Sequence, residues 1–141
     1  MSTVFRLTAA AAALAALAAC EPTASTSAGA GTGFEGGIPL GTYTLVGFGK
    51  EAVPTRDGRL RLTQGGGFSG NGPCNTFTGR NAAPLPAFRV AVMNWTDNPC
   101  GHKGFEGRFF QALTQAQEAR WEGGVLKIIG PTYMTLERSG N

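Results

Sequence analysis

The chain has 141 residues, with twelve basic and nine acidic side chains and a formal net charge of +3. A charge this small is no electrostatic footprint for nucleic acid, and a single histidine excludes a metal site built from several imidazoles. Twenty-two glycines, eight prolines and only 15% charged residues suit short strands joined by tight turns better than a helical bundle.

The first 19 residues have the pattern of an export signal. One positive charge, Arg6, precedes an apolar run over residues 7–19 that is too short to span a bilayer. The sequence Leu-Ala-Ala-Cys that ends at Cys20 is similar to the lipobox of bacterial lipoproteins. That resemblance implies cleavage before Cys20 and lipidation of its thiol. An ordinary secretory signal that happens to contain a cysteine is the alternative.

Lipidation at Cys20 would place the protein on a membrane of the bacterial cell envelope. Two or three acyl chains hold a protein on a bilayer durably. In lipoproteins of Gram-negative bacteria an aspartate after the cysteine is typical of retention in the inner membrane. Because Glu21 stands there instead, the sequence favours the outer membrane, facing the periplasm.

Residues 20–37 are predicted to tether a domain that comprises residues 38–141. The segment after Cys20 consists mostly of Pro, Thr, Ala, Ser and Gly, and Phe34 is its only bulky side chain. Such a segment buries too little apolar area to offset its conformational entropy, so we expect it to be flexible.

The domain shows a series of short strands and one helix. Alternating apolar and polar residues and the turns between them predict strands at 42–48, 59–63, 68–69, 74–79, 88–96, 119–122, 125–129 and 133–137. A helix is predicted over 102–119 from the helical spacing of its apolar residues, which are Phe105, Phe109, Ala112, Leu113 and Ala116. Because strands and helices do not alternate, the pattern predicts a mainly β fold with one α-helix: a small antiparallel, incompletely closed barrel with the helix against one side.

The segment 70–79 resembles the signature of the META domain family, also called HslJ-like. The family's core combines Gly-Cys-Asn with an aromatic residue and a further glycine, and the matching residues here are Gly70, Gly72, Cys74, Asn75, Phe77 and Gly79. Thr96 and Cys100 keep the spacing of a second family segment, and the resemblance extends over residues 41–138. Read from the residues alone, the three glycines permit positive φ or close backbone approach, and Asn75 is suited to satisfy backbone groups of a turn.

The resemblance implies an incomplete antiparallel barrel of the kind found in bacterial envelope lipoproteins. Members are associated with heat shock and drug tolerance, and their fold is likened to pilotins, which chaperone secretins. No catalytic residues belong to the family, so none is implied here. The expectation is a non-enzymatic protein that binds an envelope protein or an apolar ligand and needs no cofactor. An enzyme, an enzyme inhibitor, a pilotin-like assembly factor and a purely structural protein are the alternatives.

Lipidation of Cys20 leaves Cys74 and Cys100, and in an oxidising envelope such a pair predicts a disulfide. Buried free thiols are one alternative. A zinc site with His102 is another, but it needs a fourth ligand that no dense cluster supplies, so no metal site is expected. Neither a Ser-His-acid triad nor a carboxylate pair is indicated, because the acidic residues are scattered singly.

The domain is rich in aromatic residues, whose simplest interpretation is a packed core. A sharper hypothesis is an apolar pocket beside the helix for an acyl chain or an apolar segment. The residues expected to line it are Trp95, Phe105, Phe109, Phe110, Leu113 and Trp121. Phe110, Met93 and Met134 fall outside the expected core face, where apolar side chains would mark a contact surface.

Overall fold

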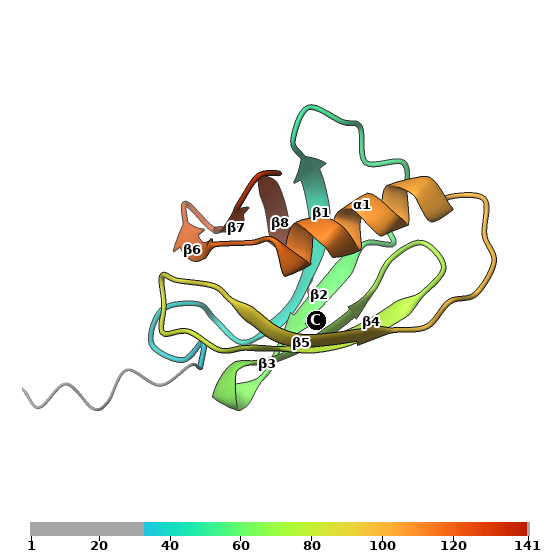
Figure 1. Ribbon diagram of the computed structural model, residues 1–141. Helices are drawn as coiled ribbons and strands as arrows, with labels where there is room; N and C mark the ends of the chain where they lie inside the picture. The colour runs from blue at the N-terminus through green and yellow to red at the C-terminus, as the bar shows by residue number, and fades with distance from the viewer. Residues whose placement is uncertain (1–32, 141) are drawn as a thin grey trace, which may run out of the picture.

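The computed structural model describes residues 33–140 (Figure 1). This part of the chain contains eight β-strands and one α-helix. They are β1 (Gly41–Phe48), β2 (Arg59–Leu62), β3 (Gly67–Asn71), β4 (Thr76–Asn81), β5 (Val90–Trp95), α1 (Lys103–Thr114), β6 (Glu118–Glu122), β7 (Val125–Ile129) and β8 (Met134–Arg138). The predicted mainly β class is confirmed. The expected export signal and the lipidation at Cys20 lie outside the described residues.

All eight strands form one antiparallel sheet in the order β5-β4-β3-β2-β1-β8-β7-β6. The sheet curls until its two edge strands, β5 and β6, approach each other. Near the start of these two strands Ala87 and Glu118 form an antiparallel bridge. At the same point the Phe88 N–H donates a hydrogen bond of 2.7 Å to the Gln117 carbonyl. Beyond this seam the two edges separate, and α1 lies across the open side of the sheet (Figure 1). The predicted incompletely closed barrel with a helix is confirmed.

Side-chain alternation sets the inner and outer faces of the sheet. In β2, Leu60 and Leu62 are buried while Arg59 and Arg61 are exposed, as a period of two predicts. The inner faces of the strands and one side of α1 form a single hydrophobic core.

The helix is shorter than predicted, because it ends at Thr114 and not near residue 119. The N–H of Gln117 donates to the Ile129 carbonyl at 2.8 Å, and Glu118 already belongs to β6. Pairing with a distant strand therefore ends the helix, although the apolar spacing continues to Ala116, which is buried in the same core.

The domain begins earlier than the sequence predicted, which corrects the extent of the tether. Phe34 is fully buried, and its ring stacks at 6.2 Å from that of Phe88. A hydrogen bond of 2.9 Å from the Ile38 N–H to the Phe34 carbonyl closes the turn between them, and Ile38 is buried as well. Residues 34–37 thus belong to the domain, because burial of one aromatic ring outweighs the polar composition around it.

Candidate functional site

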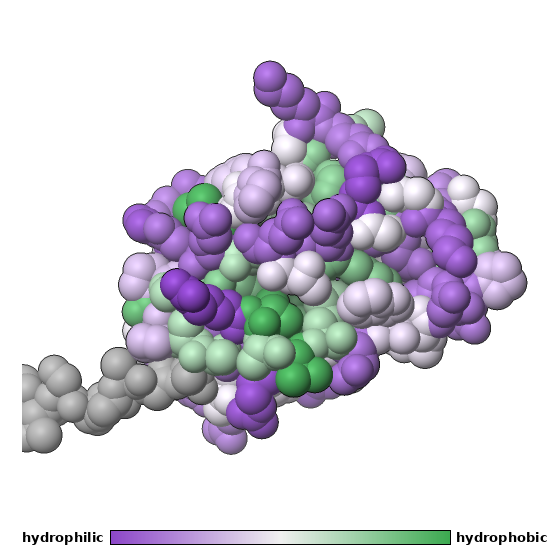
Figure 2. Space-filling view, in the orientation of Figure 1, coloured by the Kyte–Doolittle hydropathy of each residue, from purple (hydrophilic) through white to green (hydrophobic). Residues whose placement is uncertain are grey.

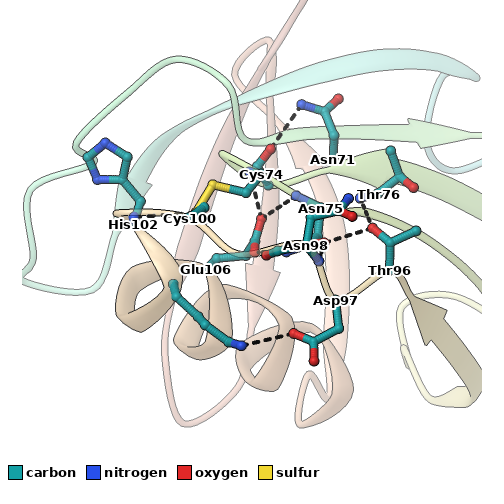
Figure 3. The surroundings of a disulfide bond; sticks show 12 residues. Asn71, Cys74, Asn75, Thr76, Thr96, Asp97, Asn98, Cys100, His102 and Glu106 are labelled. Atoms are coloured by element: carbon teal, nitrogen blue, oxygen red, sulfur yellow. Dashed lines mark hydrogen bonds and ion pairs between the residues drawn. A yellow bond between two sulfur atoms is a disulfide. The ribbon is translucent and has the colours of Figure 1, made fainter.

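The two segments of the motif meet at the N-terminal end of α1 (Figure 3). Cys74 lies in the turn before β4, and Cys100 lies in the connection between β5 and α1. The two cysteines form a disulfide whose Cα atoms are 5.9 Å apart. The expected pair is therefore present. Because the sulfur atoms are bonded to each other, the alternative zinc site with His102 lacks its two thiolates.

Asn75 joins the same two segments through its buried side chain. Its Oδ1 accepts hydrogen bonds from the Thr96 hydroxyl (2.8 Å) and from the Asn98 N–H (2.6 Å). Thr96 Oγ1 also accepts a hydrogen bond from the Thr76 N–H at 3.1 Å. Asn75 thus satisfies turn backbone groups as predicted, and it does so across two loops that are far apart in the sequence.

Glu106, in the first turn of α1, completes this arrangement, although the sequence analysis missed it. Its carboxylate is only 3% exposed. Oε1 accepts hydrogen bonds from the backbone N–H groups of Cys74 (2.9 Å) and Asn75 (2.8 Å), and Oε2 accepts one from the Asn75 side-chain amide (2.5 Å). A Cβ at Gly72 would lie 2.4 Å from Oε1, so that glycine makes room for the carboxylate. We call the disulfide, Asn75 and Glu106 together the clasp.

A signal for Glu106 was present in the sequence. Phe109, Phe110 and Leu113 follow it at i+3, i+4 and i+7, so a single acidic residue lies on the apolar face of the predicted helix. A carboxyl group on such a face is buried on folding and needs hydrogen-bond donors. Backbone N–H groups of a Gly- and Pro-containing turn are suitable donors, but pairing them with this helix requires the tertiary structure.

Gly70 and Gly79 make room for aromatic rings from the neighbouring strand. Gly70 pairs with Phe77, and Phe68 pairs with Gly79, between β3 and β4. A Cβ at Gly70 would lie 2.6 Å from the Phe77 ring, and one at Gly79 would lie 2.2 Å from the Phe68 ring. Neither glycine has a positive φ. Of the two roles that the sequence allowed, close approach is therefore the one that applies.

The six residues expected to line an apolar pocket differ in their burial. Four of them, Phe105, Phe109, Phe110 and Leu113, are buried in the core. The two tryptophans make separate contacts: Trp95 lies 5.9 Å from Phe110 and Trp121 lies 5.8 Å from Tyr43, between ring centroids. The four buried side chains pack into the core between helix and sheet.

The apolar contact surface expected at Phe110 and Met134 is absent, because both side chains are buried. The curled sheet meets α1 on more than one side, so it covers a wider apolar stripe than the spacing indicates. Phe110 packs edge-on against Phe77 at 5.1 Å. Met93, the third of these residues, is partly buried against the core.

The clasp holds α1 to the sheet and offers little reactive chemistry. Both cysteines are oxidised to the disulfide, and both oxygens of Glu106 already accept hydrogen bonds. Within residues 33–140, no group of three His, Cys, Asp or Glu side chains could hold a metal ion. A shallow hollow of about 680 Å³ lies elsewhere, beside the ion pair of Arg108 and Glu51, and the hydrogen-bonded carboxylate raises the pKa of Arg108.

The most apolar exposed region is the edge strand β5. Val92 is 58% exposed and Trp95 is 54% exposed. Figure 2 shows apolar side chains gathered below α1, where β5 lies in Figure 1. In the described part of the chain, no strand pairs with the outer edge of β5. A hollow beside its first residues is lined by Val90 and by the end of α1.

A profile of the META domain family matches residues 38–140. The chain belongs to the META domain family. The clasp of this META domain is built from its signature residues Cys74 and Asn75 and from Cys100 of the second segment, with Glu106 added from the helix, and Thr96 of the second segment binds Asn75.

Two solved structures resemble this META domain. One is the NMR structure of a protein from Burkholderia xenovorans, with a TM-score of 0.62 and 19% identity, covering 74% of this chain and 85% of that chain. The other is the crystal structure of a DUF4847 family protein from Bacteroides vulgatus, with a TM-score of 0.55 and 16% identity, covering 72% of this chain and 94% of that chain. At these identities the likeness shows the fold alone. No curated protein sequence matches the chain.

The structure contains no helix, within residues 33–140, whose length and hydropathy would allow it to cross a bilayer.

Proposed function

We propose that the protein is a lipoprotein of the bacterial cell envelope, anchored through Cys20, whose META domain acts by binding and not by catalysis. Its partner is an extended segment of another envelope protein, which adds a strand at the free edge of β5. The observation that carries this proposal is the combination of an unpaired strand edge with the exposed apolar side chains of Val92 and Trp95.

The edge of β5 lacks the features that usually protect such strands. Natural proteins cover exposed edges or place charged residues and prolines on them. Residues 90–95 contain neither a charge nor a proline. The seam between Phe88 and Gln117 ends just before β5, so the backbone groups beyond it are not used by β6. An added strand would gain main-chain hydrogen bonds and would cover Val92 and Trp95.

The packed core favours a protein partner over an acyl chain. An acyl ligand needs an apolar cavity, and four of the six side chains expected to form one are buried in the core. A strand edge instead recognises the backbone of a peptide, and alternate side chains add specificity. A pilotin-like assembly factor would be one example of such a binder.

Replacing Cys20 with serine is expected to move the protein from the membrane fraction to the soluble fraction, because serine cannot carry the thioether-linked lipid. Cell fractionation followed by immunoblotting measures the change. Glu21→Gln, which keeps the cysteine, is the control and should remain with the membrane. A Cys20→Ser protein that stays in the membrane fraction contradicts the anchor.

A lysine at position 92 is expected to abolish pairing at the β5 edge, because lysines on edge strands oppose the addition of a further strand and this one would cluster with Arg80 opposite it. A photo-crosslinker at the exposed Asn94 reports the contact in native envelopes. Crosslinking should disappear in Val92→Lys and persist in Thr78→Lys, which adds the same charge on the neighbouring strand β4. Equal crosslinking in both variants, or a product that is a dimer of this chain, contradicts the proposed partner.

A further inference from the structure

Some of the cationic side chains of the domain form ion pairs and others form none. Four cations form ion pairs, and they are Lys103, Arg108, Arg120 and Lys127. Five arginines, which lie on or just before β2, on β4 and on β8, form no ion pair within residues 33–140. Four lie on or beside the outer face of β2 and β4, and they are Arg56, Arg59, Arg61 and Arg80. The fifth, Arg138, lies at the end of β8, on the side of that strand that carries Met134 and Leu136. We call these five residues the arginine face.

Strand register explains why these side chains gather. Arg59 and Arg61 project outward because Leu60 and Leu62 between them point into the core. Arg56, Arg59 and Arg138 line one shallow hollow on this face, and Arg59, Arg61 and Arg138 line another. Arg80, on β4, lies two strands from Arg61.

Little negative charge opposes the arginine face. Asp57 and Glu137 are its nearest carboxylates in the sequence, and Glu137 lines one of the hollows. Neither of them forms an ion pair in the described structure. Glu35, which accepts a hydrogen bond from the Gly65 N–H beside Arg80, is a third carboxylate near the face. The face therefore combines five guanidinium groups with three carboxylates that form no ion pair within residues 33–140. Guanidinium groups are the side chains best suited to bind phosphate oxygens, because they present several donors in a planar fork.

We propose that the arginine face docks on the anionic phosphate headgroups of the membrane that carries the protein. The choice of a membrane rests on the proposed lipid anchor. Twelve residues lie between Cys20 and Gly33, so even a fully extended chain keeps Gly33 within about 45 Å of the anchor. The bilayer surface is thus the nearest large anionic surface that the domain meets.

The start of the domain lies close to the arginine face. The Gly65 N–H, in the turn between β2 and β3, donates a hydrogen bond to the Glu35 carboxylate at 3.0 Å. The carbonyl of the same residue accepts a hydrogen bond from Arg80 at 2.6 Å. The chain that comes from the anchor therefore joins the domain beside one of these arginines, which allows the face to turn toward the bilayer.

Docking at this face is mainly electrostatic, because most of its other side chains are polar and the apolar ones, Val46 and Val92, are single valines. Arg61 lies opposite Thr42 on β1 and Ser69 on β3, and neither can insert into hydrocarbon. Each cation near an anionic bilayer raises the partition coefficient about fivefold, and salt screens the effect. Loss of two arginines is therefore expected to lower binding roughly 10- to 30-fold.

The test uses the unlipidated chain that begins at Glu21, which contains the whole core and all eight strands. Sedimentation with vesicles of about 40% phosphatidylglycerol in phosphatidylcholine, and with pure phosphatidylcholine, measures binding. We expect binding to the anionic vesicles only, weakened by salt and reduced 10- to 30-fold in the Arg59→Gln, Arg61→Gln double variant. The Lys50→Gln, Arg89→Gln variant loses the same charge at exposed, unpaired cations away from the face, and should bind within about threefold of the unmodified chain.

Three outcomes would overturn the proposal. They are equal binding of the protein to neutral and anionic vesicles, an equal loss of binding in the two double variants, and release of the protein from the vesicles by duplex DNA at a matched phosphate concentration. The first would remove the need for anionic headgroups, the second would indicate net charge alone, and the third would indicate any phosphate polymer. Because the tested chain carries no lipid, failure here is distinguishable from failure of the Cys20 anchor in cell fractionation.

Discussion

Replacing Glu106 with alanine is expected to lower the free energy of unfolding by about 3–5 kcal/mol. The substitution leaves the N–H groups of Cys74 and Asn75 and the Asn75 amide without their acceptor in a buried site. Each buried donor that loses its partner costs about 1–3 kcal/mol, and the missing side-chain volume adds to the loss. Denaturant titration of the purified domain measures the change.

The Glu106→Gln substitution separates the contribution of the hydrogen bonds to stability from the contribution of side-chain volume. Glutamine fills the same space, and its one oxygen still accepts from the two backbone groups. Its amide nitrogen, however, then faces the Asn75 amide, whose own oxygen is already held by Thr96 and Asn98. We expect a loss of about 2 kcal/mol. The control is Glu137→Gln, an exposed residue without an ion pair, which should stay within about 0.5 kcal/mol. A Glu106→Gln domain as stable as the control would contradict the hydrogen-bonded arrangement.

Removing the disulfide by the double substitution Cys74→Ala, Cys100→Ala is expected to lower the free energy of unfolding by about 3–4 kcal/mol. The two cysteines are 26 residues apart, and without the bond the unfolded chain regains the conformational freedom of that loop. Thermal and denaturant unfolding of the oxidised protein and of the variant measure the difference.

Thiol chemistry provides the control for this expectation. Titration of the unfolded, unreduced domain should find no free thiol from Cys74 or Cys100, and a reducing agent should destabilise the unmodified domain but not the double variant. Two free thiols, or equal sensitivity to reductant, would contradict the bond. Because Asn75 and Glu106 hold the same loops, losses from the disulfide and from Glu106 should combine non-additively.

Features that depend on local pattern could be predicted from the sequence. Alternation in β2 placed Leu60 and Leu62 inside, and the order of strands and helix indicated an open antiparallel barrel. The cysteine pair followed from counting thiols in an oxidising compartment, and the turn role of Asn75 followed from its side-chain chemistry.

Features that depend on distant contacts could not be predicted. The burial of Phe34 requires Phe88, and the end of α1 requires the pairing of Gln117 with Ile129. The role of Glu106 needs a turn about thirty residues earlier in the chain. The burial of Phe110 could not be predicted either, because a one-dimensional stripe does not show how far the sheet wraps around the helix.

The hydrogen bond between Phe88 and Gln117 closes residues 89–116, which contain β5 and α1, into one segment whose base is the seam of the sheet. The disulfide ties the middle of this segment to the turn before β4. The base of this segment is thus held by a backbone hydrogen bond, and its middle is held by a covalent bond that a reductant can break. Reduction is therefore expected to release the connection before α1 from its covalent tie while the base and the hydrogen bonds of Glu106 still hold, so local opening there is separable from global unfolding.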